Sequence, residues 1–86
     1  MYELFFDRHF LSSAKKLEAK LKHDLDDCLR LLEIEPLHQH LHLKPLHGSL
    51  SGLYSFRVRK YRVIIEFLSG KKIRLVEIDK RDKVYK

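Results

Sequence analysis

Apolar and polar residues alternate with a period of two in the second half of the chain, as expected for β-strands with one buried face. The alternation runs from Tyr54 to Val58 and, after a tight turn, from Tyr61 to Phe67. Ser69-Gly70-Lys71 predicts a further turn, because serine and glycine are common where a chain reverses. Residues 72–78 then predict a third strand of the same group.

The first half of the chain repeats its apolar residues at helical spacing instead. Charged residues such as Glu18 and Asp27 fall between them and form the polar side of the predicted helix. Pro36 ends this region, because proline lacks a backbone N–H and disfavours helix at the residue before it. The pattern fits one long helix or a tight helical hairpin that breaks near residues 19–22. The apolar positions are Phe10, Ala14, Leu17, Leu21, Leu25, Cys28 (or Leu29) and Leu32.

Residues 2–6 are rich in aromatic side chains and predict a strand, and Asp7 is placed to cap the helix that follows. Residues 37–52 are a connector rich in His, Leu, Gly and Ser. We therefore predict an α+β fold in the order β-α-α-β-β-β. Its sheet is twisted and mainly antiparallel, with two helices or a helical hairpin packed on one face. The chain of 86 residues is expected to form a single domain, residues 1–86.

Positive charge is concentrated in the second half of the chain. Residues 1–36 contain 6 Lys/Arg and 8 Asp/Glu, whereas residues 37–86 contain 12 Lys/Arg and 4 Asp/Glu. A basic half joined to a mildly acidic half fits a face that binds a polyanion. A solvated surface that aids solubility would account for the imbalance equally well.

The predicted sheet gathers arginines on the face that its apolar residues leave open. Arg57, Arg59 and Arg62 share that face with Ser55 if the strands pair as the alternation indicates. Guanidinium groups so close repel each other, and a phosphate chain would relieve that repulsion through charge-assisted hydrogen bonds. The alternative is that arginine stems cover sheet carbons while their charged ends remain in water.

The composition argues against several classes of protein. Cys28 is the single cysteine, so no disulfide can form within the chain, and we expect the cytoplasm. The N-terminus lacks the features of a signal peptide, and no apolar run approaches a membrane-spanning length. His38, His40 and His42 alternate in the connector, but three histidines without a Cys or carboxylate partner make a weak metal site. We expect no metal, no other cofactor and no membrane partner.

Two motifs follow Lys44 closely: Gly52-Leu53-Tyr54-Ser55-Phe56-Arg57-Val58 and Tyr61-Arg62-Val63-Ile64-Ile65-Glu66. Together with the run from Lys44 through Leu50-Ser51-Gly52, they resemble the RelE/ParE toxin superfamily of type II toxin-antitoxin systems. Residues 79–85 are similar to the family's closing basic segment, which often ends in Val-Tyr. The resemblance covers nearly the whole chain and implies a RelE/ParE-like fold.

RelE-like members of the superfamily cleave mRNA in the ribosomal A site without a metal, through attack of the substrate's 2′-hydroxyl on its own phosphodiester. The resemblance therefore implies a ribosome-dependent endoribonuclease toxin, an mRNA interferase. It places Arg57 near the 2′-hydroxyl, Arg62 at the charge of the phosphorane, and Arg81 at the leaving oxygen. Tyr85 corresponds to the closing tyrosine that stacks on or orients the base.

Basic residues around these predicted catalytic positions are expected to contact RNA. Ser55 stands where RelE-like enzymes have a second strand lysine, and an arginine is a poor general base because it stays protonated. Lys44, His47 or Tyr85 could take the proton, or the site could act through orientation and charge alone. The expected RNA-binding residues are Lys44, His47, Arg59, Lys60, Arg74, Lys80 and Lys83.

Two other functions share the resemblance. ParE-like members carry the same central motif and inhibit DNA gyrase by binding it. A catalytically degenerate RNA-binding module of this fold is the third possibility, and Ser55 is its best support. Each implies a cognate antitoxin protein, with a partly disordered and often acidic segment that wraps the toxin. The nuclease function adds the ribosome and mRNA as partners.

Overall fold

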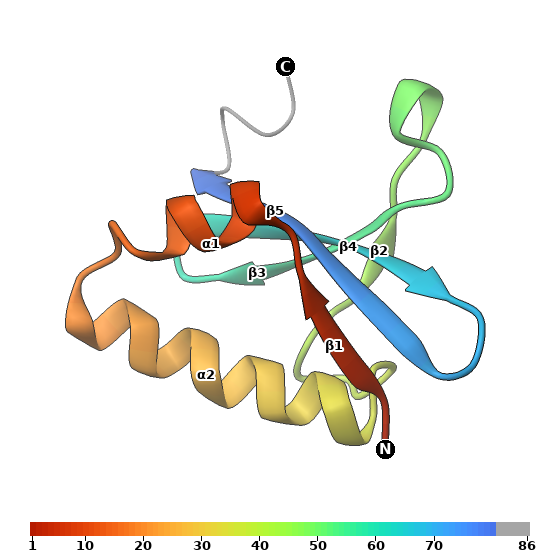
Figure 1. Cartoon of the computed structure of the whole chain (residues 1–86), viewed down its shortest axis with the longest axis horizontal. Coiled ribbons are helices and arrows are strands. Elements are labelled where there is room, and N and C mark those ends of the chain that lie inside the picture. The colour runs from red at the N-terminus through yellow and green to blue at the C-terminus, as the bar shows by residue number, and fades with distance from the viewer. Residues whose placement is uncertain (81–86) are drawn as a thin grey trace.

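The computed structural model describes residues 1–80, which form a mixed sheet and two α-helices (Figure 1). The predicted α+β class and the order of the long elements are confirmed, and one short strand is added within the connector. In chain order the elements are β1 (Glu3–Phe6), α1 (Arg8–Ala14), α2 (Ala19–Ile34), β2 (Lys44–Pro45), the 3₁₀ helix η1 (Gly48–Leu50), β3 (Tyr54–Val58), β4 (Tyr61–Leu68) and β5 (Lys72–Lys80).

The five strands pair in the order β1-β5-β4-β3-β2. β1 runs parallel to β5, beside which it lies in Figure 1, and the other neighbours are antiparallel. β2 was not predicted, because two residues are too short for an alternation to register. Its Pro45 cannot donate a ladder hydrogen bond, which suits its place at the edge of the sheet.

The helical region is a hairpin whose break lies earlier than predicted. α1 ends at Ala14 and α2 begins at Ala19, so the bend precedes residues 19–22. No proline or glycine marks it. Leu17 is buried within the bend and joins the core, so packing rather than local preference ends α1.

The main core lies between the helices and one face of the sheet. Its sheet side comes from alternate residues such as Phe56, Val63 and Ile65, as the period of two predicts. Each fully buried apolar side chain contributes roughly 1.5–3 kcal/mol to folding, so this layer fixes the strand register. The helix side of the core consists of Phe10, Leu17, Leu21, Leu25 and Leu32.

The opposite face of the sheet is less open than predicted. Ile64 points away from the main core, yet only 4% of its surface is exposed. Leu46 packs against it, with Leu50, Leu53 and Val76 around the pair. The connector therefore folds over the middle of this face, and the space left for polar chemistry lies beside this apolar patch.

Candidate active site

Arg57 and Arg62 lie directly opposite each other on β3 and β4, on the face away from the helices. The side chain of Arg57 is exposed, whereas Arg62 is buried with 5% of its surface exposed. A nitrogen of the Arg62 guanidinium donates a 3.4 Å hydrogen bond to the hydroxyl of Ser55, which is itself buried. The structure therefore brings together Arg57 and Arg62, two of the three arginines expected to converge, and the buried one is bonded to Ser55.

A cavity of about 240 Å³ opens beside these arginines. It forms where β2 begins, because the connector pairs with β3 only at Lys44, opposite Ser55, and at Pro45, opposite Tyr54, and its preceding residues leave the edge of β3 open. Three neighbouring strands each supply one cation to its wall, and its described lining contains no carboxylate. The lining residues are Leu41, His42, Lys44, Phe56, Arg57 and Arg62. Such a cavity attracts an anion.

One acidic residue lies close to this cluster without lining the cavity. Asp79 on β5 is opposite Arg62 in the strand register, so Arg62 sits between Arg57 on one side and Asp79 on the other. The Asp79 carboxylate accepts a 2.7 Å hydrogen bond from the backbone N–H of Lys80. The arrangement offsets part of the positive charge on the buried side and leaves the cavity side cationic.

Arg59 does not share the face of Arg57, and this part of the prediction is wrong. β3 ends at Val58, and Arg59 occupies the hairpin turn with a φ of 57°, so the alternation stops there. Its guanidinium forms an ion pair with Asp24 of α2, on the side of the helices. Arg59 and Lys60 line a separate cavity of about 250 Å³ with Lys20.

Arg74 is engaged in an internal network. Its guanidinium donates a 2.9 Å hydrogen bond to Glu66 and a 2.5 Å hydrogen bond to Asp7. Both bonds raise the pKa of Arg74 above its ordinary value, the one to Glu66 most. Asp7 precedes α1 as predicted, but its side chain makes no capping hydrogen bond, because the carboxylate turns to Arg74 instead. Arg74 is therefore poorly placed for RNA.

The remaining predicted residues are spread along the chain. His47 is exposed before η1 and lies outside the arginine cavity, whereas Lys44 lines it. Lys80 is exposed at the end of β5 and lines another cavity, of about 310 Å³, with Lys16 and Tyr61. The predicted positions Arg81, Lys83 and Tyr85 lie outside the described residues.

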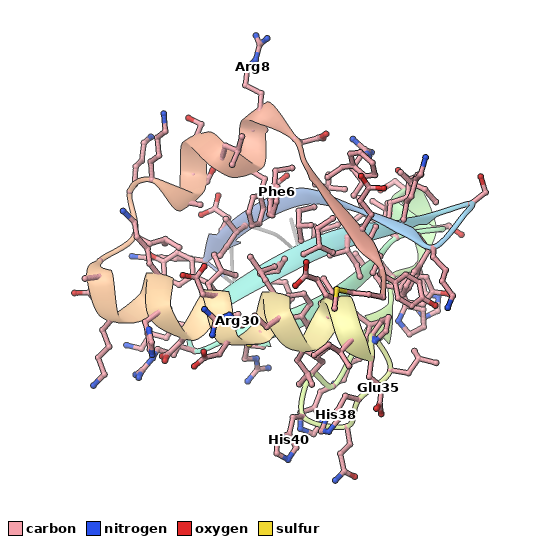
Figure 2. The ribbon with its side chains drawn as sticks, turned by 60° about the horizontal axis from the view of Figure 1, so that its bottom comes forward. Phe6, Arg8, Arg30, Glu35, His38 and His40 are labelled. Carbon is pink, nitrogen blue, oxygen red and sulfur yellow. The ribbon has the colours of Figure 1, made fainter. Side chains whose placement is uncertain are left out.

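The connector histidines separate into two groups. The rings of His38 and His40 meet edge to face with centroids 4.9 Å apart, past the end of α2 near Glu35 (Figure 2). His42 instead lines the arginine cavity. Within residues 1–80, no group of three or more His, Cys, Asp or Glu side chains is placed to hold a metal ion. The sequence indicated at most a weak metal site or a phosphate contact for His42, and its position beside Arg57 was not predicted.

A larger cavity of about 560 Å³ lies between the two helices. Its floor is apolar and includes Phe6, which lies between the helices in Figure 2, and Leu11. Arg8, Lys15 and Lys22 stand around it. Exposed apolar residues gathered in this way suit a protein partner. In the part of the chain that the structure describes, no helix is long and apolar enough to cross a membrane.

Comparison with known proteins adds a family to this geometry. The profile of the family described as ParE toxin of type II toxin-antitoxin system, parDE, matches residues 4–85. No curated protein sequence shows significant similarity to the chain.

Solved toxin structures have the same fold. RelE in the archaeal RelE-RelB complex from Pyrococcus horikoshii OT3 superposes with a TM-score of 0.80 at 22% identity, over 93% of this chain and 94% of that one. YafQ from E. coli strain BL21(DE3) superposes with a TM-score of 0.79 at 19% identity, over 100% of both chains. The YoeB/ParE toxin from Agrobacterium tumefaciens superposes with a TM-score of 0.79 at 17% identity, over 92% of this chain and 98% of that one. These superpositions confirm the predicted fold.

Proposed function

This chain belongs to the ParE toxin family, within the RelE/ParE superfamily of type II toxin-antitoxin toxins, and within that superfamily we propose that it is an mRNA interferase. In this proposal it is a metal-independent, ribosome-dependent endoribonuclease. The observation that carries the proposal is the cavity in which Lys44, Arg57 and Arg62 converge from three adjacent strands. The fold that it shares with RelE and YafQ is consistent with this activity.

The proposed reaction needs little beyond positioned positive charge. The 2′-hydroxyl loses its proton, its oxygen bonds to the adjacent phosphorus, and the bond from phosphorus to the 5′-oxygen breaks. That oxygen leaves with its electron pair and takes up a proton, so the products are a 2′,3′-cyclic phosphate and a 5′-hydroxyl. Negative charge accumulates on the phosphorane, and preorganised cations stabilise that state more than the ground state.

Burial makes Arg62 the best candidate for this stabilisation. Since only 5% of the surface of Arg62 is exposed, this residue has already lost most of its hydration, so a phosphate that reaches it displaces little water. Its bond to Ser55 fixes the direction in which it faces. Arg57, exposed at the mouth, is proposed to contact the sugar and phosphate beside the 2′-hydroxyl. Arg81 and Tyr85 keep the roles that the resemblance implies.

The wider RNA contact is proposed to spread from this cavity along exposed cations. Lys44 lines the cavity itself. Lys60 is exposed in the turn between β3 and β4, and Lys80 is exposed at the end of β5, both close to Arg57 and Arg62 in the strand register. His47 and Lys83 complete the proposed contact set. Each phosphate that the protein neutralises would steepen the slope of the logarithm of the binding constant against the logarithm of the salt concentration by about one.

A cognate antitoxin is the proposed protein partner. RelE of Pyrococcus horikoshii is in complex with RelB, and that structure resembles this chain in fold. The cavity between α1 and α2 offers an apolar floor with Arg8, Lys15 and Lys22 around it, which complements a segment with apolar and acidic side chains. Asp26 is its one acidic lining residue among those described.

The nuclease proposal is tested by adding the purified chain to a reconstituted translation reaction and mapping the 5′ ends of the message. We expect in-frame breaks that require translation. Arg62→Gln should lower cleavage by about 10²- to 10³-fold, while Arg30→Gln, an exposed change on α2 (Figure 2), should leave it intact. Arg62→Lys keeps the positive charge and serves as a second variant in case Arg62→Gln fails to fold. Arrested translation with intact message would overturn the proposal.

Inhibition of DNA gyrase is the second candidate, and the match to the ParE family profile favours it. A gyrase inhibitor would block supercoiling by purified gyrase and leave translated mRNA intact. The same preparation can be used in both assays, so one comparison separates the two functions. Inhibited supercoiling without mRNA breaks would replace the nuclease assignment.

A further inference from the structure

His42 forms part of the wall of the arginine cavity, next to Lys44, Arg57 and Arg62. The other two lining residues, Leu41 and Phe56, are apolar. Lysine and arginine side chains hold their protons at neutral pH, whereas imidazole is the side chain that exchanges one there. Among the residues that line this cavity in the described chain, His42 alone can accept a proton.

The proposed reaction requires such an acceptor, because the 2′-hydroxyl must lose its proton. Ser55 cannot serve, since its hydroxyl is buried and already accepts a hydrogen bond from Arg62. His47 is exposed and does not line the cavity. The position of His42 thus fills a chemical role that the arginines beside it cannot fill.

The backbone at His42 is unusual. Its φ of 51° is in the left-handed region, which costs free energy for residues other than glycine and occurs often at functional sites. Arg59 and Lys71 share this feature, but both lie at hairpin turns. His42 instead follows a turn closed by hydrogen bonds from its own N–H to Gln39 and from that of Leu41 to His38. This conformation redirects the chain toward β2 at the cavity.

We propose that His42 is the general base of the cleavage reaction, an inference that rests on the nuclease function proposed above. A lone pair on the neutral imidazole takes the proton of the 2′-hydroxyl as the oxygen forms its bond to phosphorus. The 5′-oxygen departs with the electrons of the broken bond and is protonated by an acid of the site or by water. The imidazolium then returns its proton to solvent.

Asparagine is the informative replacement at this position. It tolerates positive φ better than most residues, and its amide does not accept a proton at neutral pH. His42→Gly provides a second variant, because glycine adopts this backbone without strain. His40→Asn is the matched control, since His40 is exposed on the same connector and does not line the cavity.

The test is the single-turnover cleavage rate on stalled ribosome-mRNA complexes, measured from about pH 5.5 to 8.5, the range in which imidazole titrates. The other groups facing His42 are Lys44 on β2, Arg57 on β3 and Arg62 on β4, and such side chains do not change charge in that range. We expect the wild-type rate to rise with pH and level off. His42→Asn should be about 10²- to 10⁴-fold slower, should lose that rise, and should recover partly with added imidazole.

The outcomes separate the two proposals. A wild-type chain that never cuts mRNA defeats the nuclease function, and the inference about His42 with it. A wild-type chain that cuts, beside a folded His42→Asn variant with the same rate and pH profile, defeats the inference alone. A slower variant that keeps the wild-type pH profile would show that His42 binds or positions RNA and is not the base.

Discussion

Arg57 on β3 and Arg62 on β4 form a directly opposed cross-strand pair. Two positive charges therefore lie opposite each other at positions where side chains of opposite charge are favourable. Opposed like charges destabilise a sheet, and burial of Arg62 adds a desolvation cost. Asp79, the partner of Arg62 on the other side, offsets only one of the two charges. A sheet optimised for stability alone would not keep this pair. For this physical reason we assign the pair a role in binding an anionic substrate.

Arg57→Gln should separate stability from function. Removal of the exposed member relieves the repulsion, so the free energy of unfolding should stay the same or rise by about 0.2–1 kcal/mol. Cleavage of mRNA should fall, because one of the three cavity cations is lost. Urea denaturation and the cleavage assay measure the two effects on one preparation. A variant less stable by more than about 1 kcal/mol would contradict the view that this pair strains the fold.

Two replacements of Ser55 should both destabilise the fold, but to different degrees. Ser55→Ala removes the hydrogen bond to Arg62 and should lower the free energy of unfolding by about 1 kcal/mol. Ser55→Lys restores the residue type that RelE-like enzymes carry, yet the position is 1% exposed beside a buried arginine. A second buried cation there should cost roughly 3–5 kcal/mol. Thermal unfolding compares the variants, and a stable lysine variant with higher cleavage would contradict this reading.

The strands were predictable from the sequence because one face of the sheet is buried. Burial of Phe56, Val63 and Ile65 on that face imposes the period of two that the sequence displays. The bend before α2 was not predictable to the residue, because the burial of Leu17 depends on distant strands. β2 likewise exists through its pairing with β3, a long-range contact that leaves no local pattern.

The site was predictable only where regular strand geometry continues. Arg57 and Arg62 lie within β3 and β4, so the alternation places them correctly. Arg59 is two residues beyond Arg57, but the hairpin turn begins there and directs it to Asp24. His42 reaches the cavity through the path of the connector, which no sequence period encodes.

Arg74 should contribute stability that does not change around neutral pH. Its guanidinium bonds to Glu66 and Asp7 raise its pKa, so the folded state holds this proton more tightly than the unfolded state. The contribution is complete below the ordinary pKa of arginine and is lost only as pH rises past it. Arg74→Gln should therefore cost about 1 kcal/mol, after screening by solvent, at every pH between about 6 and 9.

Urea denaturation of Arg74→Gln across that range checks this expectation, with the exposed Arg30→Gln as its control. A cost that varied over the range would show that another titrating group, rather than the arginine itself, governs the network. Loss of RNA affinity with unchanged stability would instead return Arg74 to the RNA-binding surface.

Cys28 should be a slow nucleophile in the folded chain. It lies partly buried on α2, and burial raises the pKa of its thiol, with further increases from the charges of Asp24 and Asp27. Since the thiolate is the reactive form, alkylation at pH 8 should be slower than in urea, where the thiol ionises normally. The raised pKa also means that the thiol favours folding fully below its unfolded pKa, and that this contribution is lost as pH rises through the folded pKa.

Asp27→Asn should speed alkylation of the folded protein, because it removes one nearby negative charge and leaves the ion pair of Asp24 with Arg59 in place. Rates of iodoacetamide labelling against pH, followed by mass spectrometry, measure the shift. Equal rates for the folded and unfolded chains would show that the thiol is neither shielded by burial nor sensitive to these carboxylates.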